Sequence, residues 1–149
     1  TPRRSDLWTA ALRMLAQHPL LGVGPDNFRH VYGTYLGLST WDERVHANNF
    51  YLEMLADVGL PATAAFGGLL AIVGVCLVRC LRAEPRAAPV RLWAVGLAAA
   101  MAAFLIHGLL DYFLEFTPTY LLFWLVAGLA IALERRVLDP KLYPAPVAP

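Results

Sequence analysis

Four polar residues recur at regular intervals in one short stretch of the chain. His46, Asn49, Glu53 and Asp57 stand at offsets of 0, 3, 7 and 11 within residues 46–58. On a helix, at about 100° per residue, their side chains fall within a sector of about 80° and form one polar stripe. Histidine can serve as a base near neutral pH, and a neighbouring carboxylate can orient the imidazole or pair with an arginine. The spacing alone slightly favours the alternative, which is the solvated face of an amphipathic helix.

A second set of ionisable residues follows a long apolar stretch. His107 and Asp111 are four residues apart, which makes them neighbours on a helix, and Glu115 continues the line if the helix persists. A charge at the bilayer centre costs about 2.5–3.5 kcal/mol on insertion scales, so ionisable groups near that depth are often functional. A structural hydrogen bond between His107 and Asp111 and a catalytic one fit the sequence equally well.

Around these residues the chain is strongly apolar. Of its 149 residues, 58% are hydrophobic and 15% charged, and the mean hydropathy is +0.53. Soluble domains average about 45–50% apolar and about 25% charged residues, and this composition excludes intrinsic disorder, a coiled coil, collagen and a disulfide scaffold. The net charge of +1 provides no dense basic face, which excludes nucleic acid as a partner. Cys76 and Cys80 are interpreted as small packing residues, because a metal site needs more ligands than this stretch offers.

Three apolar stretches predict transmembrane helices at about residues 60–81, 92–110 and 112–133. The first would span about 33 Å at a rise of about 1.5 Å per residue, enough for a bilayer core. The third reaches across only if its helix starts near Tyr112 or if the bilayer thins locally. The predicted fold class is therefore all-α: a fragment of a polytopic integral membrane protein, with three transmembrane helices in residues 59–134.

Basic residues predict the orientation, because short cytoplasmic loops retain Lys and Arg during insertion. Residues 111–118 contain no basic side chain, whereas those flanking the other span ends are Arg79, Arg82, Arg86, Arg91, Arg135, Arg136 and Lys141. We therefore expect residues 1–58 to be periplasmic and the Pro-rich tail, residues 135–149, to be cytoplasmic, in a bacterial inner membrane. Because no earlier span precedes residues 1–58, we also expect the chain to be the C-terminal part of a larger protein.

Short amphipathic helices are expected within residues 1–58. Ser5 can cap a helix that runs to about Gln17, and it ends at His18 because a residue before proline leaves the helical region. After the turn at residues 22–27, Asp26 can cap a second helix. A third helix would carry the polar stripe and end at a break formed by Gly59, Leu60 and Pro61.

Three motifs resemble the O-antigen ligase and polymerase superfamily of bacterial envelope glycan transferases. The first joins Arg4 and Trp8 to HPLLGVGPDNF, which starts at His18, and it is similar to the family's outer-loop pattern. The second, HANNFYLE from His46 followed by LADVGLP, is similar to the family's HAHNLYLE and LAETGLPG. The third is HGLLD from His107, with the aromatic-rich third span. Together they cover nearly all of this chain but only the C-terminal portion of the family's architecture.

Three positions depart from the family pattern. Asn48 stands where the family usually has a second histidine, which leaves His46 as the only imidazole of the motif. Asp57 replaces the family's glutamate, and Ala62 replaces the glycine after proline. If the family's base is the second histidine, His46 is a partner of the base.

The resemblance implies transfer of a glycan from a polyprenyl-diphosphate-linked donor to an acceptor hydroxyl, inverting and independent of metals or other cofactors. Such a reaction needs cations at the leaving diphosphate and a base at the acceptor. A guanidinium binds phosphate oxygens bidentately and stays charged. The expected diphosphate-binding residues are Arg4, Arg3, Arg29 and Arg44, of which Arg4 is favoured by its motif. The expected catalytic residues are His46, Asp57 and Glu53, supported by Asn49, His107 and Asp111.

The expected partners are the lipid-linked donor, a lipid or glycan acceptor, membrane lipids and the remaining N-terminal transmembrane helices of the parent protein. Without those helices the chain is expected to be inactive. Ligases, polymerases and protein-glycosylating members share the motifs, so the acceptor stays open. The alternative is a transporter or a helix-packing subunit of an envelope complex, in which His107 and Asp111 line a path or bind a neighbouring helix.

Overall fold

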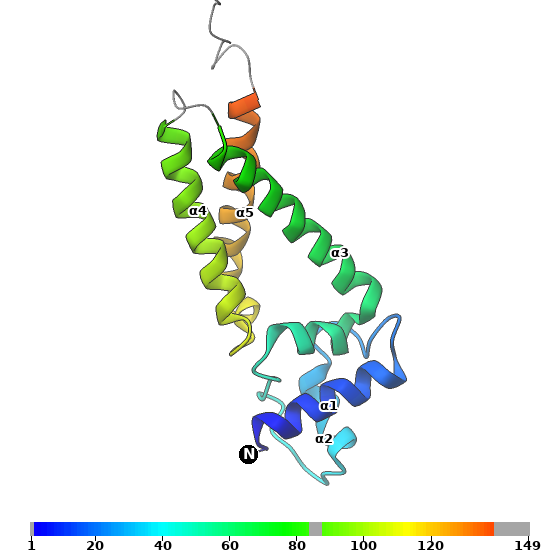
Figure 1. The fold of residues 1–149 in the computed structure, drawn as a ribbon. Coiled ribbons are helices and arrows are strands. Elements are labelled where there is room, and N and C mark those ends of the chain that lie inside the picture. Colours follow the sequence, from blue (N-terminus) through cyan, green and yellow to red (C-terminus); the bar gives the residue numbers. More distant parts are fainter. Residues whose placement is uncertain (1, 84–87, 139–149) are drawn as a thin grey trace, which may run out of the picture. The chain divides into compact units, whose positions relative to one another are not determined.

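The computed structural model describes residues 2–83 and 88–138 (Figure 1). These residues form helices and connecting segments without any strand, which confirms the predicted all-α class. The helices are α1 (Arg4–Gln17), α2 (Phe28–Leu36), α3 (Phe50–Leu81), α4 (Ala88–His107), the short 3-10 helix η2 (Phe113–Glu115) and α5 (Thr117–Leu138). The described residues divide into two compact units: those within 2–68 and 105–117 form the first, and those within 69–104 and 118–138 form the second.

Helix α1 begins at Arg4, two residues earlier than a cap at Ser5 predicts. The backbone N–H of Arg3 donates to the carboxylate of Asp6 across 3.0 Å, so the Asp6 side chain caps the first turn of the helix. Ser5 lies within the first turn, and its prediction as the cap was wrong. The helix ends at His18, as predicted, where the backbone N–H bonds the carbonyl of Met14.

Helix α2 is also capped differently from the prediction. Asn27 precedes the first helical residue, whereas Asp26 has a φ of +60°. This left-handed conformation turns the chain into the helix, so Asp26 does not cap it. An acidic side chain from α3, described below, binds the backbone N–H groups at this end instead.

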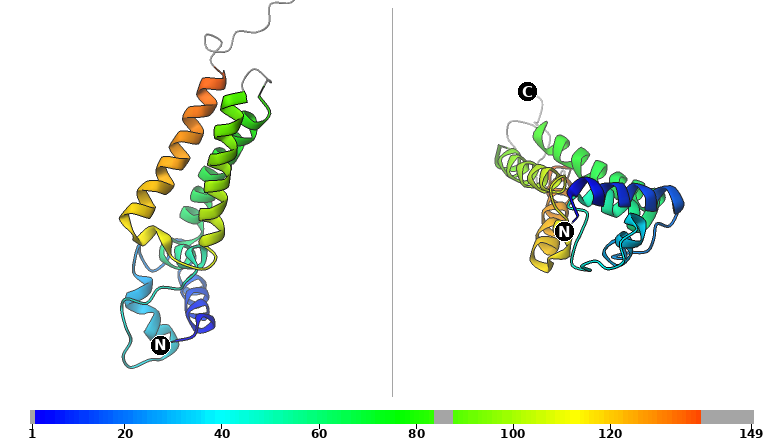
Figure 2. Two further views of the ribbon diagram at one scale, coloured as in Figure 1. Left: turned by 90° about the vertical axis from the view of Figure 1, so that its left-hand side faces the viewer. Right: turned by 90° about the horizontal axis from the view of Figure 1, so that it is seen from below.

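The core of the first unit is built mainly from α1 and α2, which lie side by side (Figure 2). Its α1 residues recur three or four positions apart, as one helical face requires. Its buried members are Leu7, Ala10, Ala11, Met14, Phe28, Tyr32, Ala47 and Ala56.

Helix α3 is interrupted at Gly59, which has φ +73° and ψ −176°. This confirms the predicted break between the third short helix and the first span. The segment after α1 packs at the break, where the N–H of Leu60 donates to the carbonyl of Pro19 across 2.8 Å. A Cβ on Gly59 would lie 2.5 Å from the carbonyl oxygen of Leu20, so both the close approach and the positive φ require glycine.

Within the part of the chain that the structure describes, three helices are long and apolar enough to cross a membrane: residues 50–81, 89–107 and 117–137. Their ends differ from the expected spans. Helix α4 stops at His107, where the N–H groups of Leu110 and Asp111 turn back to its carbonyl, and α5 begins at Thr117. Residues 108–116 therefore form a turn with η2, not helical continuations of either span.

Within the second unit, a polar contact joins α3 to α5. Arg79 Nη1 donates to Glu134 across 2.8 Å, and the thiol of Cys76 lies 3.0 Å from the other carboxylate oxygen. Cys80 packs with Val90 and Ala94 of α4. The predicted tail is helical to Leu138; residues 139–149, like Arg86, lie outside the described residues.

Candidate functional site

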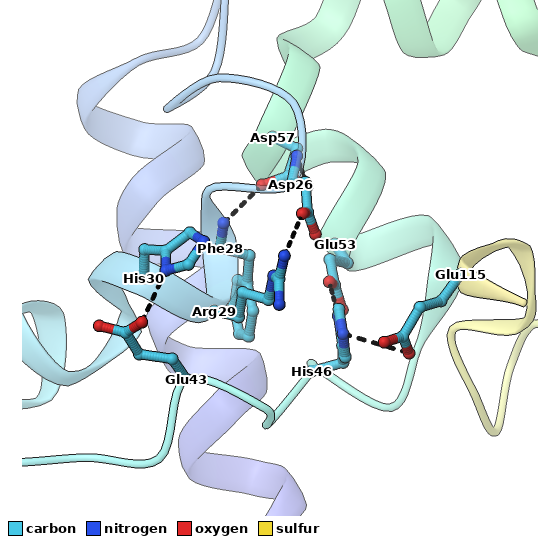
Figure 3. Close-up of polar contacts among 9 residues, drawn as sticks. All are labelled: Asp26, Phe28, Arg29, His30, Glu43, His46, Glu53, Asp57 and Glu115. Atoms are coloured by element: carbon cyan, nitrogen blue, oxygen red, sulfur yellow. Dashed lines mark hydrogen bonds and ion pairs between the residues drawn. The ribbon is translucent and has the colours of Figure 1, made fainter.

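The His46 side chain forms a buried pair with Glu53 in the first unit (Figure 3). His46 lies in the segment before α3, so the predicted helix from residue 46 was wrong about its start. The chain instead turns at Asn48, whose φ is +50°, and brings Nδ1 of His46 to a carboxylate oxygen of Glu53. The Glu53 side chain is 1% exposed and that of His46 is 7% exposed.

The second carboxylate oxygen of Glu53 holds the backbone beside the histidine. It accepts the N–H of Ala47 across 2.7 Å. The indole N–H of Trp8 in α1 donates to the carbonyl of Ala47 across 3.0 Å. Each backbone group of Ala47 thus has a partner, and the segment that carries His46 is attached to both α1 and α3.

The turn after α4 encloses the other side of the imidazole. The N–H of Phe50 donates to the carbonyl of Gly108 across 2.8 Å, which joins the start of α3 to this turn. The Tyr112 ring stacks on the imidazole with centroids 4.9 Å apart and planes at 11°. Glu115 of η2 places a carboxylate oxygen 3.3 Å from Nε2 of His46.

Electrostatics at His46 favour its protonated form. Burial of the imidazole opposes the charge, but Glu53 and then Glu115, with a smaller contribution from Asp26, outweigh this effect. The pKa of His46 is therefore raised above its usual 6.5. With Nδ1–H donated to Glu53, Nε2 is the nitrogen that can exchange a proton with a substrate.

Asp57 anchors the start of α2. Its carboxylate accepts the N–H of Phe28 across 2.8 Å and that of Asp26 across 3.0 Å. Anionic groups suit this end of a helix, where N–H groups lack intrahelical partners. The described contacts of Asp57 are thus structural, although the sequence predicts that it or Glu53 fixes the imidazole.

The four candidate arginines occupy different environments. Arg3 and Arg4 are exposed at the start of α1. Arg44 is bound to Asp42 by two guanidinium contacts of 2.9 and 2.8 Å, and its side chain is 88% exposed. Arg29 of α2 pairs with Asp26 at 2.5 Å, while its buried Nε lacks a hydrogen-bond partner (Figure 3).

The three residues predicted to support the site lie in or beside the turn that follows α4. The Asn49 side chain accepts the N–H of Leu52 across 3.0 Å and donates to the carbonyl of Leu109 across 3.4 Å. His107 and Asp111 face each other at 3.7 Å, and both side chains are about half exposed. None of the described residues forms a group of three or more His, Cys, Asp or Glu side chains that could hold a metal ion.

A groove of about 650 Å³ also lies in the first unit. It runs between α1, α2 and the segment before His46, and its last lining residue, Val45, is the neighbour of His46 in the chain. Its lining combines aromatic, acidic and basic side chains. Among the lining residues are Asp6, Thr9, Arg13, Tyr32, Trp41 and Asp42.

Sequence reasoning missed two members of the site. The predicted helix through this region aligned Glu115 with His107, and it gave no reason to expect Tyr112 beside His46. The helix-ending turn at Gly108 redirects both residues toward His46. The sequence signal was a glycine directly after His107, the position that glycine favours just past a helix end.

These features define a multi-pass membrane protein whose first unit contains a buried acid–base pair. Residues 2–67 match the family model described as O-Antigen ligase. The match confirms the predicted resemblance over a segment that contains both long motifs and the His46–Glu53 pair. It indicates a role in glycan transfer during envelope biosynthesis. Comparison with curated proteins and with solved structures finds no match.

Proposed function

We propose that this protein acts in the transfer of a glycan from a polyprenyl-diphosphate-linked donor to an acceptor hydroxyl. The observation that carries the proposal is the buried His46–Glu53 pair within the segment that matches the O-antigen ligase family. Glu53 fixes the tautomer and orientation of the imidazole, which is the usual function of a carboxylate behind a catalytic histidine.

In the proposed step, Nε2 of His46 takes the proton of the acceptor hydroxyl. The hydroxyl oxygen forms a bond to the anomeric carbon of the donor as the bond from that carbon to the diphosphate oxygen breaks. The diphosphate leaves with the electron pair. A single displacement of this kind inverts the anomeric centre, and no metal or other cofactor is assigned to it.

Arginine would offset the charge that develops on the diphosphate. Arg4 lies one helical turn before Trp8 and so shares a face with the side chain that holds the His46 segment. Arg29 contributes a second positive charge, which interacts with Asp26 and Glu115. We assign Arg4 to the diphosphate first and Arg29 second, whereas Arg44 is already paired with Asp42.

The remaining parts of the proposal follow from the membrane spans. The first unit would face the periplasm, the C-terminus would be cytoplasmic, and the N-terminal helices of the parent protein would supply the rest of the lipid-binding cavity. The groove beside Val45 would receive saccharide units.

Complementation tests this function. The full-length protein carrying His46→Gln or Arg4→Gln is expressed in cells that lack the wild-type copy, and transferred glycan is measured together with the amount of protein in the membrane. His46→Gln should reduce transfer at least about 100-fold, the typical contribution of a general base. Arg4→Gln should also reduce transfer.

His30→Gln is the matched control, because His30 also pairs with a carboxylate, Glu43, but its side chain is 41% exposed. This variant should transfer glycan normally. Normal transfer by His46→Gln at a wild-type membrane level would overturn the assignment of the base. Substrate flux without transfer would instead indicate a transporter.

A further inference from the structure

Nε2 of His46 is enclosed in the resting protein. The atom itself is buried, and no hydrogen bond satisfies it. Tyr112 covers one face of the ring. The carboxylate of Glu115 lies 3.3 Å from Nε2, at ion-pair distance but without the alignment of a hydrogen bond. An acceptor hydroxyl can therefore reach this nitrogen only after a covering group moves.

Glu115 is the covering group that can move at the lowest cost. Its side chain is 45% exposed, so rotation into water breaks little packing. It ends a 3-10 helix of only three residues, and a single residue with extended backbone, Phe116, separates it from α5. Glu53, by contrast, is buried and also holds the backbone of Ala47. The enclosed nitrogen would thus open on the side of Glu115.

The charges around the ring favour an imidazolium in this enclosed state. Each ring nitrogen lies near a carboxylate, Glu53 at Nδ1 and Glu115 at Nε2, and the positive charge of a doubly protonated histidine is favourable to both. Asp26 adds negative charge, which its ion pair with Arg29 partly offsets. Because an imidazolium cannot accept a proton, His46 becomes a base only after this arrangement changes.

We propose that Glu115 is a positioning residue that keeps His46 protonated at rest and leaves Nε2 when the acceptor hydroxyl arrives. The inference rests on the proposed function of His46 as the base. When Glu115 turns away, the imidazolium loses one counter-charge and releases the Nε2 proton to water. The neutral nitrogen then takes the hydroxyl proton during transfer. Each cycle returns His46 to its protonated form and releases one proton in total.

The test combines a titration with a pH profile of transfer. His46 is followed by NMR of its ring Cε1–H signal in the purified full-length protein, with His46→Gln assigning the signal. In Glu115→Gln, the titration midpoint should fall by about one pH unit, because one of two facing carboxylates is lost. Transfer requires neutral His46, so the acid limb of its pH profile should move to lower pH by the same amount.

Two variants serve as controls. Asp111→Asn makes the same charge change in the same turn, but Asp111 faces His107 and should leave the His46 titration unchanged. Glu115→Asp keeps the carboxylate and should restore most of the wild-type midpoint. A purely structural effect of Glu115 would lower transfer at every pH without moving the acid limb.

An unchanged His46 midpoint in Glu115→Gln overturns the inference, whatever happens to transfer. A lowered midpoint with a matching shift of the transfer profile supports it. A lowered midpoint without any shift of the profile supports the pairing of Glu115 with His46 but overturns the base function of His46. The failure of the inference and the failure of the proposed function are thus distinguishable.

Discussion

The backbone N–H of Gly24 donates a hydrogen bond of 2.8 Å to the carbonyl oxygen of Asp57. Beside it, the N–H of Val23 donates to the carbonyl of Ala56 across 2.8 Å. These carbonyls precede the break at Gly59 and would otherwise lack partners. The glycine-rich turn after α1 therefore completes the helical segment that carries Glu53. The two long motifs of the sequence thus form one structural arrangement.

Gly22→Ala should strongly destabilise the first unit. A Cβ at this position would lie 2.3 Å from the carbonyl carbon of Asp57, and φ is +65°. Gly37→Ala is the matched control, because Gly37 has φ +72° but nothing within 4 Å of a Cβ. Thermal unfolding in detergent should show a cost of about 1–2 kcal/mol for Gly37→Ala and at least about 3 kcal/mol for Gly22→Ala. Equal costs would contradict the close approach.

Asp57 should prove important for stability. Asp57→Ala removes the acceptor of two backbone N–H groups at the start of α2, at about 1–3 kcal/mol for each group left unpaired. Asp57→Asn keeps one amide oxygen and should cost less. As a control, Asp42→Ala removes an exposed partner of Arg44 and should leave the unfolding temperature close to that of the wild type. If Asp57→Ala unfolds at the wild-type temperature but loses transfer, Asp57 acts in the reaction instead.

The periodicity of the chain was enough to predict the helices and the break at Gly59. Apolar length identifies the spans, and a glycine beside a proline at the end of a polar stripe marks the interruption. The polar stripe also contained both members of the His46–Glu53 pair, but the helical geometry that it predicted for His46 was wrong. Its spacing assumes a helix, whereas His46 reaches Glu53 because the left-handed Asn48 turns the preceding segment back.

The remaining errors arise where tertiary contacts replace local ones. Ser5 and Asp26 are suitable capping residues, but Asp6 and the distant Asp57 perform that function. A sequence does not show which of several carboxylates reaches a helix end. The sequence likewise did not predict the contact of Glu134, which is 8% exposed and pairs with Arg79 of α3. Pairing between separate helices leaves no periodic signal.

The His46–Glu53 pair should make stability depend on pH. The pKa of His46 is raised in the folded state, so the protonated pair stabilises the fold fully below the unfolded value of about 6.5. That contribution is lost as the pH rises through the higher folded pKa. The difference in unfolding free energy between wild type and His46→Gln should therefore shrink with rising pH. A difference that is constant from acid to mildly alkaline pH would contradict the charged pair.

Trp8→Phe should reduce transfer while leaving the fold largely intact. The change keeps an aromatic ring but removes the N–H that donates to Ala47, a hydrogen bond worth about 1 kcal/mol. The adjacent His46 would then be held less firmly, and small displacements of a catalytic group slow reactions steeply. Trp93→Phe, at a side chain on α4 that is 68% exposed, controls for the loss of an indole.

The two variants should unfold within about 1 kcal/mol of the wild-type protein. Trp8→Phe should nevertheless transfer glycan about ten times more slowly, with the lower rate in kcat and not in KM, because the contact positions the base and touches no substrate. If Trp8→Phe instead raised KM alone, the indole would belong to the substrate-binding surface, and Arg4 on the same face of α1 would bind beside it.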